Sequence, residues 1–179
     1  MTVTPLPVIV RDAADADMAA VRSIYAYYVL RSCASFEEES PDLEEMRIRR
    51  SAILERGLPY LVAEADGEVV GFTYAAPFRT RSAYRYTIED SIYVAPSIVR
   101  RGIGITLLQT LIDRCTALGF RQMIGVIGDS ANFGSIGLHR RVGFRQEGVL
   151  RGVGLKFGNW IDVVIMHRPL GELPSRSDD

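Results

Sequence analysis

The chain has 179 residues, of which 47% are hydrophobic, and a formal net charge of −1. This length is enough for one domain with a substantial core and short for two, so we expect one domain over residues 1–170 and a polar, disordered tail over 171–179. A chain so close to neutral has no broad field to attract nucleic acid or an anionic membrane, so we expect neither as a partner and any phosphate recognition must be local.

The first third of the chain predicts a strand and two helices. A short apolar run at residues 8–10 is typical of a strand, and residues 18–28 place apolar side chains on one helical face. Residues 30–39 have no period and indicate a loop. Serine, proline and aspartate at 40–42 indicate a helix start, because a hydroxyl can cap the first amides and proline has no N–H to lose; we expect that helix to run to Gly57.

The middle of the chain predicts antiparallel strands followed by a long strand. Residues 60–65 and 68–75 are rich in β-forming residues and are joined by Asp66-Gly67, a strong hairpin signal. Residues 78–85 are polar and basic. They lead into a strand over 86–94, which ends at Pro96 because proline cannot donate to a sheet ladder.

A glycine turn and a helix follow that strand. The helix carries apolar side chains at helical spacing from Leu108 to Leu118 and stops at Gly119. The first turn of a helix leaves N–H groups unpaired and carries partial positive charge, so it favours an anion. Glycines let the backbone approach a phosphate, and arginines add charge. We therefore predict a pyrophosphate site made by Arg100, Arg101, Gly102, Ile103, Gly104 and Ile105.

Two other phosphate-binding classes are excluded by this turn. It lacks the Gly-Lys-Ser/Thr of a nucleotide P-loop, and Leu107 stands where a dinucleotide-binding fingerprint requires its third glycine. Taken alone, the segment is also compatible with an ordinary tight connection between a strand and a helix.

The remaining segments predict a strand, a helix and two more strands. A strand at residues 122–127 precedes a helix that begins at Asn132 and stops at Gly143, and strands at 144–151 and 160–166 flank a turn. Antiparallel strands first and strand-helix-strand units later predict an α/β fold with a mixed sheet covered by helices.

The cysteines and the N-terminus favour a cytoplasmic protein. Cys33 and Cys115 are too few for a disulfide framework, and Cys115 falls on the apolar stripe of a helix. The N-terminal residues lack a basic region followed by a long apolar run, and no later segment has the apolar length of a membrane span.

The glycine turn, together with the Asn132-x-x-Ser135 helix that ends in Gly-Phe, resembles the GNAT superfamily of N-acetyltransferases. More narrowly, residues 86–94, the Leu138-His139 pair and residues 154–162 resemble its phosphinothricin and methionine sulfoximine acetyltransferase branch, and the match runs in order over residues 8–170. The resemblance implies a GNAT-like sheet with antiparallel N-terminal strands and a parallel centre, acetyl-CoA as co-substrate, a small amino-acid analogue as acceptor and a homodimer.

Glu89 is the candidate general base. An amine must lose a proton to attack a thioester, and the period of two along the strand puts Glu89, Ser91 and Tyr93 on one face and Ile92 and Val94 on the other. The related enzymes use a glutamate in this setting as the base. The alternative is a surface or salt-bridged glutamate; Asp90 faces the other way and is expected to be structural.

His139 stands where many relatives place a tyrosine that protonates the leaving thiolate. An imidazole could serve at physiological pH, but a single histidine on a helix can also be a satisfied packing residue. Both readings stay open.

The resemblance implies that the pantetheine arm pairs with the backbone of Ile92, Tyr93 and Val94. Asn132 and Ser135 lie one helical turn apart, so both can face the cofactor, although they can equally form an N-terminal cap. Val99 departs from the glutamine or arginine that is common in the family.

Arginines just before the catalytic strand are candidates for binding the acceptor. An arginine fork suits a carboxylate or a phosphinate, and relatives hold the amino-acid carboxylate here, which matches Arg79 and Arg85 better than Arg81. Tyr84 and Phe36 could close over the acceptor side chain. Exposed arginines without a function are the alternative.

Two other functions remain open. One keeps the cofactor and changes the acceptor to a polyamine, an aminoglycoside or a protein amine, although arginines near the site disfavour cations. The other is a coenzyme A sensor without turnover, which the presence of Glu89 disfavours. No cluster of histidine, cysteine and carboxylates has metal-ligand spacing, so we expect no metal.

Overall fold

The structure is a computed structural model that describes residues 7–98 and 101–171. Its strands are β1 (Ile9–Asp12), β2 (Tyr60–Ala65), β3 (Glu68–Pro77), β4 (Thr87–Val94), β5 (Gln122–Gly128), β6 (Arg145–Lys156) and β7 (Asn159–Pro169). Its α-helices are α1 (Met18–Arg31), α2 (Leu43–Leu54), α3 (Ile103–Ala117) and α4 (Phe133–Arg141). Short 3₁₀ turns cover Asp15–Asp17, Ser82–Tyr84 and Pro96–Ile98. Of the predicted polar tail, only Gly171 is described.

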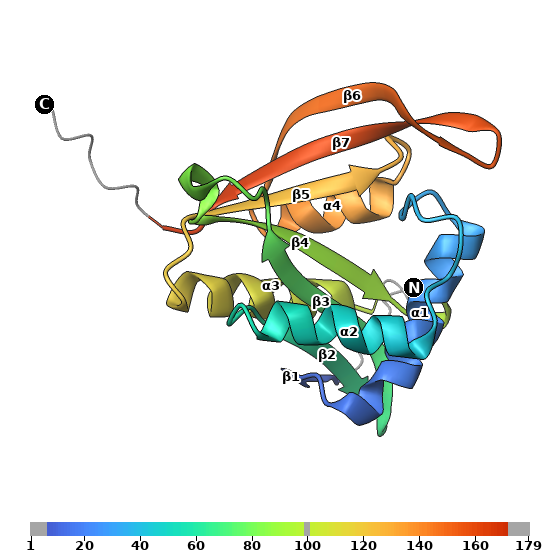
Figure 1. Ribbon diagram of the computed structural model, residues 1–179, viewed down its shortest axis with the longest axis vertical. Helices are drawn as coiled ribbons and strands as arrows, with labels where there is room; N and C mark the ends of the chain where they lie inside the picture. Colours follow the sequence, from blue (N-terminus) through green and yellow to red (C-terminus); the bar gives the residue numbers. More distant parts are fainter. Residues whose placement is uncertain (1–6, 99–100, 172–179) are drawn as a thin grey trace, which may run out of the picture.

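The strands form one seven-stranded sheet in the order β1-β2-β3-β4-β5-β7-β6. Only β4 and β5 are parallel; the other neighbours in the sheet are antiparallel. Figure 1 shows α1 and α2 in front of the sheet and α3 and α4 behind it. The predicted mixed sheet with antiparallel N-terminal strands, a parallel centre and flanking helices is therefore confirmed.

The two helical layers meet opposite faces of β4, as its period of two requires. On the front face, the Tyr93 ring lies 5.0 Å from that of Tyr25 in α1, centroid to centroid. On the back face, Ile92 and Val94 pack against a buried cluster that includes Ile103 and Leu107 of α3. The strand thus presents Glu89, Ser91 and Tyr93 toward the front and its aliphatic residues toward α3.

Two turns that the sequence predicts have the expected backbone conformation. Asp66 and Gly67 have φ of 52° and 81°, the left-handed pair that a two-residue hairpin needs. Gly119 has φ of 89° just after Leu118, the C-cap of α3, where a left-handed residue lets the chain leave the helix.

The predicted start of α2 is wrong by two residues. Asp42, rather than Ser40, caps the helix: its carboxylate accepts a hydrogen bond from the Glu45 amide at 2.8 Å. A carboxylate at the cap, followed by acidic side chains in the first turn, complements the positive end of the helix. The helix ends at Leu54, before Gly57, and α1 continues to Arg31 into the segment predicted as loop.

Within residues 7–98 and 101–171, no helix combines the length and the apolar character that crossing a membrane requires.

Candidate active site

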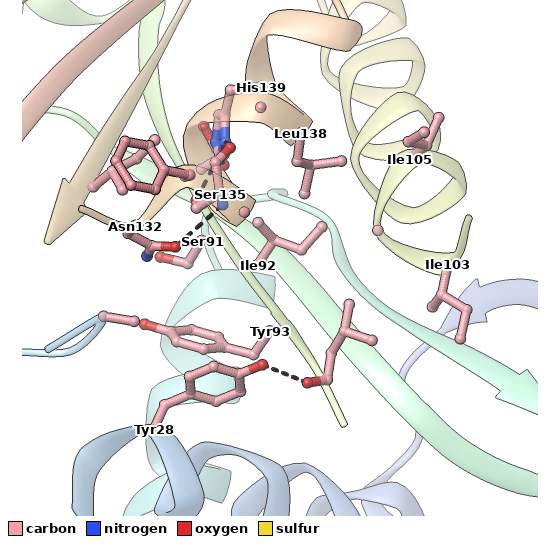
Figure 2. Close-up of a pocket in the computed structure, with 18 of the residues that line it drawn as sticks. Tyr28, Ser91, Ile92, Tyr93, Ile103, Ile105, Asn132, Ser135, Leu138 and His139 are labelled. Atoms are coloured by element: carbon pink, nitrogen blue, oxygen red, sulfur yellow. Dashed lines mark hydrogen bonds and ion pairs between the residues drawn. The ribbon is translucent and has the colours of Figure 1, made fainter. Parts of the chain in front are cut away.

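The strands β4 and β5 separate halfway along their length. They pair from Thr87 with Gln122 to Asp90 with Gly125, and beyond that point β4 continues to Val94 and β5 to Gly128 without pairing to each other. A cleft of about 790 Å³ opens at this separation, bounded by the end of β4, the start of α3, the end of β5 and the first turns of α4. Figure 2 shows residues that line it. The sheet therefore has an internal edge at its centre.

The backbone of β4 along this edge can pair with a ligand. Phe78 N–H donates to Thr87 C=O and Ala95 N–H donates to Val70 C=O, so Thr87 and Ala95 point their backbone groups toward β3. In an antiparallel ladder this direction alternates from residue to residue. The backbone groups of Ile92 and Val94 therefore point away from β3, toward the cleft. The Tyr28 hydroxyl donates a hydrogen bond to the Val94 carbonyl oxygen at 2.5 Å (Figure 2). An extended chain that carries amides can add to such an edge as a further strand.

The start of α3 forms the second wall. Gly102, with φ of 84°, leads into the helix, and the first bond of the helical type runs from Thr106 N–H to Gly102 C=O. The amides of Ile103, Gly104 and Ile105 thus have no partner within the helix, and all three residues line the cleft. Arg101 is exposed and does not line it. Arg100 and Val99 lie outside the described residues.

Asn132 and Ser135 on α4 form the third wall. The Asn132 side-chain oxygen accepts from the Ser135 amide at 3.2 Å, so the capping role is present, and both residues also line the cleft. Gly104 faces this helix: a Cβ there would lie 3.1 Å from a methyl carbon of Leu138. The glycine therefore lets α3 and α4 approach closely at the mouth of the cleft.

His139 is paired inside the protein. It is 2% exposed; its Nε2 lies 3.0 Å from Asp90 Oδ2 and its Nδ1 lies 2.8 Å from the Ser135 carbonyl oxygen. Burial lowers the pKa of His139, but the Asp90 carboxylate and the Ser135 carbonyl together raise it above its usual value. In this arrangement both ring nitrogens have partners, which matches the packing role better; proton donation stays a prediction. Asp90 lies on the back face, where the sequence analysis placed it.

Glu89 lies just beyond the cleft, two residues before Ser91 on the same face. It is half-buried, and burial, together with the charge of Asp90, raises the pKa of Glu89, while Arg79 lowers it. The carboxyl group therefore keeps its proton to a higher pH than in water, which suits a base that works near neutrality. Its position on β4, opposite Ile124 of β5, is close to the end of the paired region.

The candidate acceptor residues lie on two exposed segments. Arg79 stacks on the Phe78 ring at 4.4 Å and Arg85 on the Tyr86 ring at 4.9 Å, while Tyr84 is exposed between them. The charge of Arg79 lowers the pKa of Glu89. No interaction joins Arg85 to Glu89 among the described residues.

Phe36 is held by the C-terminal hairpin. A Cβ on Gly154 of β6 would lie 2.1 Å from the Phe36 ring, so this position has no room for a side chain. Nearby, the buried Lys156 donates to the Ser35 carbonyl oxygen at 2.5 Å, and burial lowers the pKa of Lys156. The loop that carries Phe36 is thus fixed from the far end of the chain.

Sequence reasoning missed the contacts that fix this loop and the end of β4. Tyr28 appeared only as one member of an apolar helical face, and Lys156 only within the segment 154–162 that carries the family resemblance. Neither partner could be found from periodicity, because each is a backbone carbonyl distant in sequence. The one signal in the sequence was the position of Lys156 in a strand next to a turn.

Comparisons with known proteins agree with this geometry. The model of the acetyltransferase (GNAT) family matches residues 23–144. Phosphinothricin N-acetyltransferase of Alcaligenes faecalis is 54% identical over 161 residues, which are 90% of this chain and 82% of that protein. L-methionine sulfoximine/L-methionine sulfone acetyltransferase of Pseudomonas paraeruginosa is 39% identical over 169 residues, 94% of this chain and 96% of that protein.

Among solved structures, a GNAT superfamily phosphinothricin acetyltransferase from Sinorhizobium meliloti in complex with AcCoA superposes with a TM-score of 0.89. It is 45% identical, and the alignment covers 94% of both chains.

Proposed function

Because the chain belongs to the acetyltransferase (GNAT) family and is an N-acetyltransferase, we propose that it acetylates the α-amine of a small amino-acid analogue. Phosphinothricin, methionine sulfoximine and methionine sulfone are the proposed acceptors, since two relatives are named for acting on them. The observation that carries the proposal is the separation of β4 from β5, with helix amides at its mouth and Glu89 near its inner end.

The residues present fit acetyl-CoA. The unpaired amides of Ile103, Gly104 and Ile105 can hold its diphosphate at the positive end of α3, and Arg100 and Arg101 would add charge. The backbone of Ile92 and Val94 can hold the amides of the pantetheine arm. When bound, acetyl-CoA supplies an acetyl thioester. Asn132 and Ser135 would contact the same arm from α4 while they keep the helix cap.

Glu89 would act as the base. Its carboxylate takes a proton from the ammonium group of the acceptor, directly or through water, and leaves a neutral amine. The amine would attack the thioester carbonyl, so that a C–N bond forms and the C–S bond breaks with its electron pair leaving on sulfur, and the proton that the amine nitrogen then loses would pass to the thiolate, directly or through water. The Val94 N–H would donate to the carbonyl oxygen as negative charge develops there. Arg79, assisted by Arg85, would hold the acceptor carboxylate, with Tyr84 and Phe36 closing over the bound acceptor.

A homodimer and a cytoplasmic location complete the proposal. The β6–β7 hairpin exposes more than half of the surface of several large apolar side chains, which supports a contact with a second copy: Leu150, Val153, Leu155, Phe157 and Trp160. Free Cys33 and Cys115 are compatible with a reducing compartment.

The test is an acceptor panel with purified protein. Thiol release from acetyl-CoA and the mass of the product are measured with phosphinothricin, methionine sulfoximine and methionine sulfone, and with a polyamine, an aminoglycoside and a peptide amine as competing classes. We expect turnover with the amino-acid analogues. Faster turnover with a cationic amine would replace the proposed acceptor, and calorimetric binding of acetyl-CoA without thiol release from any amine would identify a sensor instead.

A further inference from the structure

A second cavity opens on the face of the sheet that carries Glu89. It has a volume of about 280 Å³ and is lined by residues of α1, α2, β2 and β3. Figure 1 shows α2 crossing in front of β2 and β3. Its walls are aromatic and aliphatic: Tyr25, Tyr60, Phe72 and Tyr74, with Met46 and Ile53 from α2. None of the reaction steps above uses it. Its volume is slightly below that of ordinary ligand pockets, and its mostly apolar lining suits part of a small ligand, such as a side chain.

The floor of this cavity is a stack of rings, one of which carries the hydroxyl of Tyr60. The Tyr60 ring lies 5.1 Å from that of Tyr74 and 6.0 Å from that of Phe72, with interplanar angles of 13° and 4°. Tyr60 is 2% exposed, and burial raises its pKa, so the hydroxyl stays protonated. Among the described residues it has no hydrogen-bond partner, yet it is not one of the polar atoms that are sealed from solvent. An oxygen atom of a ligand in the cavity can satisfy it.

The cavity lies within reach of a substrate at Glu89. Tyr74 is directly opposite Ser91 across the β3–β4 ladder, and Glu89 is two residues from Ser91 on the same face. Such diagonal neighbours are about 7–8 Å apart between their backbones, and both Glu89 and Arg49 act on the pKa of Tyr74. A ligand whose amine meets Glu89 can therefore extend a side chain into the cavity.

The rim is built in advance. Arg49 donates to Glu37 at 2.7 Å and to Glu45 at 2.8 Å, and the Tyr25 hydroxyl donates to Glu37 at 2.9 Å. These bonds join α1, α2 and the loop between them beside the cavity, whose lining includes Tyr25 and Arg49. The guanidinium of Arg49 has two carboxylate partners, whereas the Tyr60 hydroxyl has none among the described residues. A rigid rim also spares the ligand the cost of ordering it.

We propose that this cavity is the specificity pocket for the acceptor side chain. The side chain would be unbranched and of methionine length, would lie against the rings of Tyr60 and Tyr74, and would end in an oxygen-bearing group that accepts from the Tyr60 hydroxyl. Sulfone, sulfoximine and phosphinate groups share that chemistry. The assignment rests on the proposed function, because it presumes an amino-acid acceptor with its amine at Glu89.

Removal of the hydroxyl tests the polar contact. Tyr60→Phe should raise the KM for methionine sulfone about five- to tenfold, the value of one hydrogen bond, with little change in kcat. Norleucine has no such oxygen, so its inhibition constant against methionine sulfone should stay the same. Tyr27→Phe, on an exposed ring outside both cavities, is the control. A defect in folding would instead change both ligands alike.

Filling the cavity tests its occupancy. Ala52 is exposed and lines the cavity, whereas its exposed neighbour Ser51 does not, so Ala52→Leu and Ser51→Leu form a matched pair. Ala52→Leu should raise the KM for methionine sulfone and the inhibition constant of norleucine at least fivefold, but leave that of alanine unchanged. Turnover with unaltered selectivity in Ala52→Leu and Tyr60→Phe would overturn this assignment alone. Absence of turnover with every amino-acid analogue would overturn the proposed function and this assignment with it.

Discussion

The link between Arg79 and Glu89 gives the sharpest test of the catalytic assignment. The raised pKa of Glu89 comes from burial and from the charge of Asp90, and Arg79 opposes both. A base works only when it is ionised, so kcat/KM should fall on the acid side through a pKa that lies above that of an ordinary glutamate. Glu89→Gln has nearly the same shape and cannot take a proton. It should lose about 10²–10⁴-fold in kcat/KM, or about 2.7–5.4 kcal/mol of transition-state stabilisation.

The direction in which a substitution of Arg79 shifts the pH profile distinguishes a general base from a merely structural glutamate. Arg79→Met removes the charge that lowers the pKa of Glu89, so the acid limb of the kcat/KM profile should move to higher pH. Arg85→Met should leave that limb in place and change only the KM for the acceptor. The profiles are measured by thiol release under conditions where acetyl-CoA saturates the enzyme. An acid limb that stays unchanged in Arg79→Met, or full activity in Glu89→Gln, would refute the assignment.

Three further predictions follow from the packing around the site. Asp90→Asn should lower the free energy of unfolding by about 3 kcal/mol, because it removes the carboxylate charge that pairs with a buried imidazole. Since Asp90 raises the pKa of His139 in the folded protein, the pair stabilises fully below the unfolded pKa, and urea titrations should show the difference shrinking as pH rises through the folded pKa. Gly154→Ala should lower the free energy of unfolding by about 1–3 kcal/mol and raise the KM for the acceptor, because the new methyl group displaces the Phe36 ring. Gly148→Ala, on the same strand with open space around it, is the control and should change stability by less than about 0.5 kcal/mol in thermal unfolding. Asn132→Ala should lose about 1 kcal/mol of helix capping; Asn132→Asp should keep the cap and raise the KM for acetyl-CoA, because it adds negative charge beside an anionic ligand.

Local chemistry made much of the fold predictable. The hairpin at Asp66-Gly67 and the end of α3 at Gly119 follow from residues that tolerate a left-handed backbone, and the side of β4 that bears Glu89 follows from the period of two. The start of α2 was missed because serine, proline and aspartate each have a place near a helix start, and sequence does not rank their hydrogen bonds. The structure decides for Asp42, whose carboxylate reaches the Glu45 amide.

Long-range contacts set the limit of sequence reasoning. The loop with Phe36 has no period, yet it is fixed by Lys156, which is 121 residues away from its partner Ser35. The separation of β4 from β5 leaves no signal in the sequence either, because both strands continue with β-forming residues past their last paired residues. The cavity under α2 depends on stacking between β2 and β3 and on a helix that leaves space above the rings. Each of these features arises from elements that meet only in the folded protein.

The pair Glu89 and Asp90 shows how one strand can give neighbouring carboxyl groups different chemistry. Their side chains point to opposite faces, so they enter different environments although their backbones are adjacent. Asp90 is buried against His139, and its hydrogen bond to the imidazole commits it to the fold. Glu89 is half-buried beside a cleft, with an arginine near it and no hydrogen bond in the described part of the chain that would hold its carboxylate. Only the second environment leaves a carboxylate free to exchange a proton with a ligand, which is why an exchange of roles between the two residues is incompatible with this sheet.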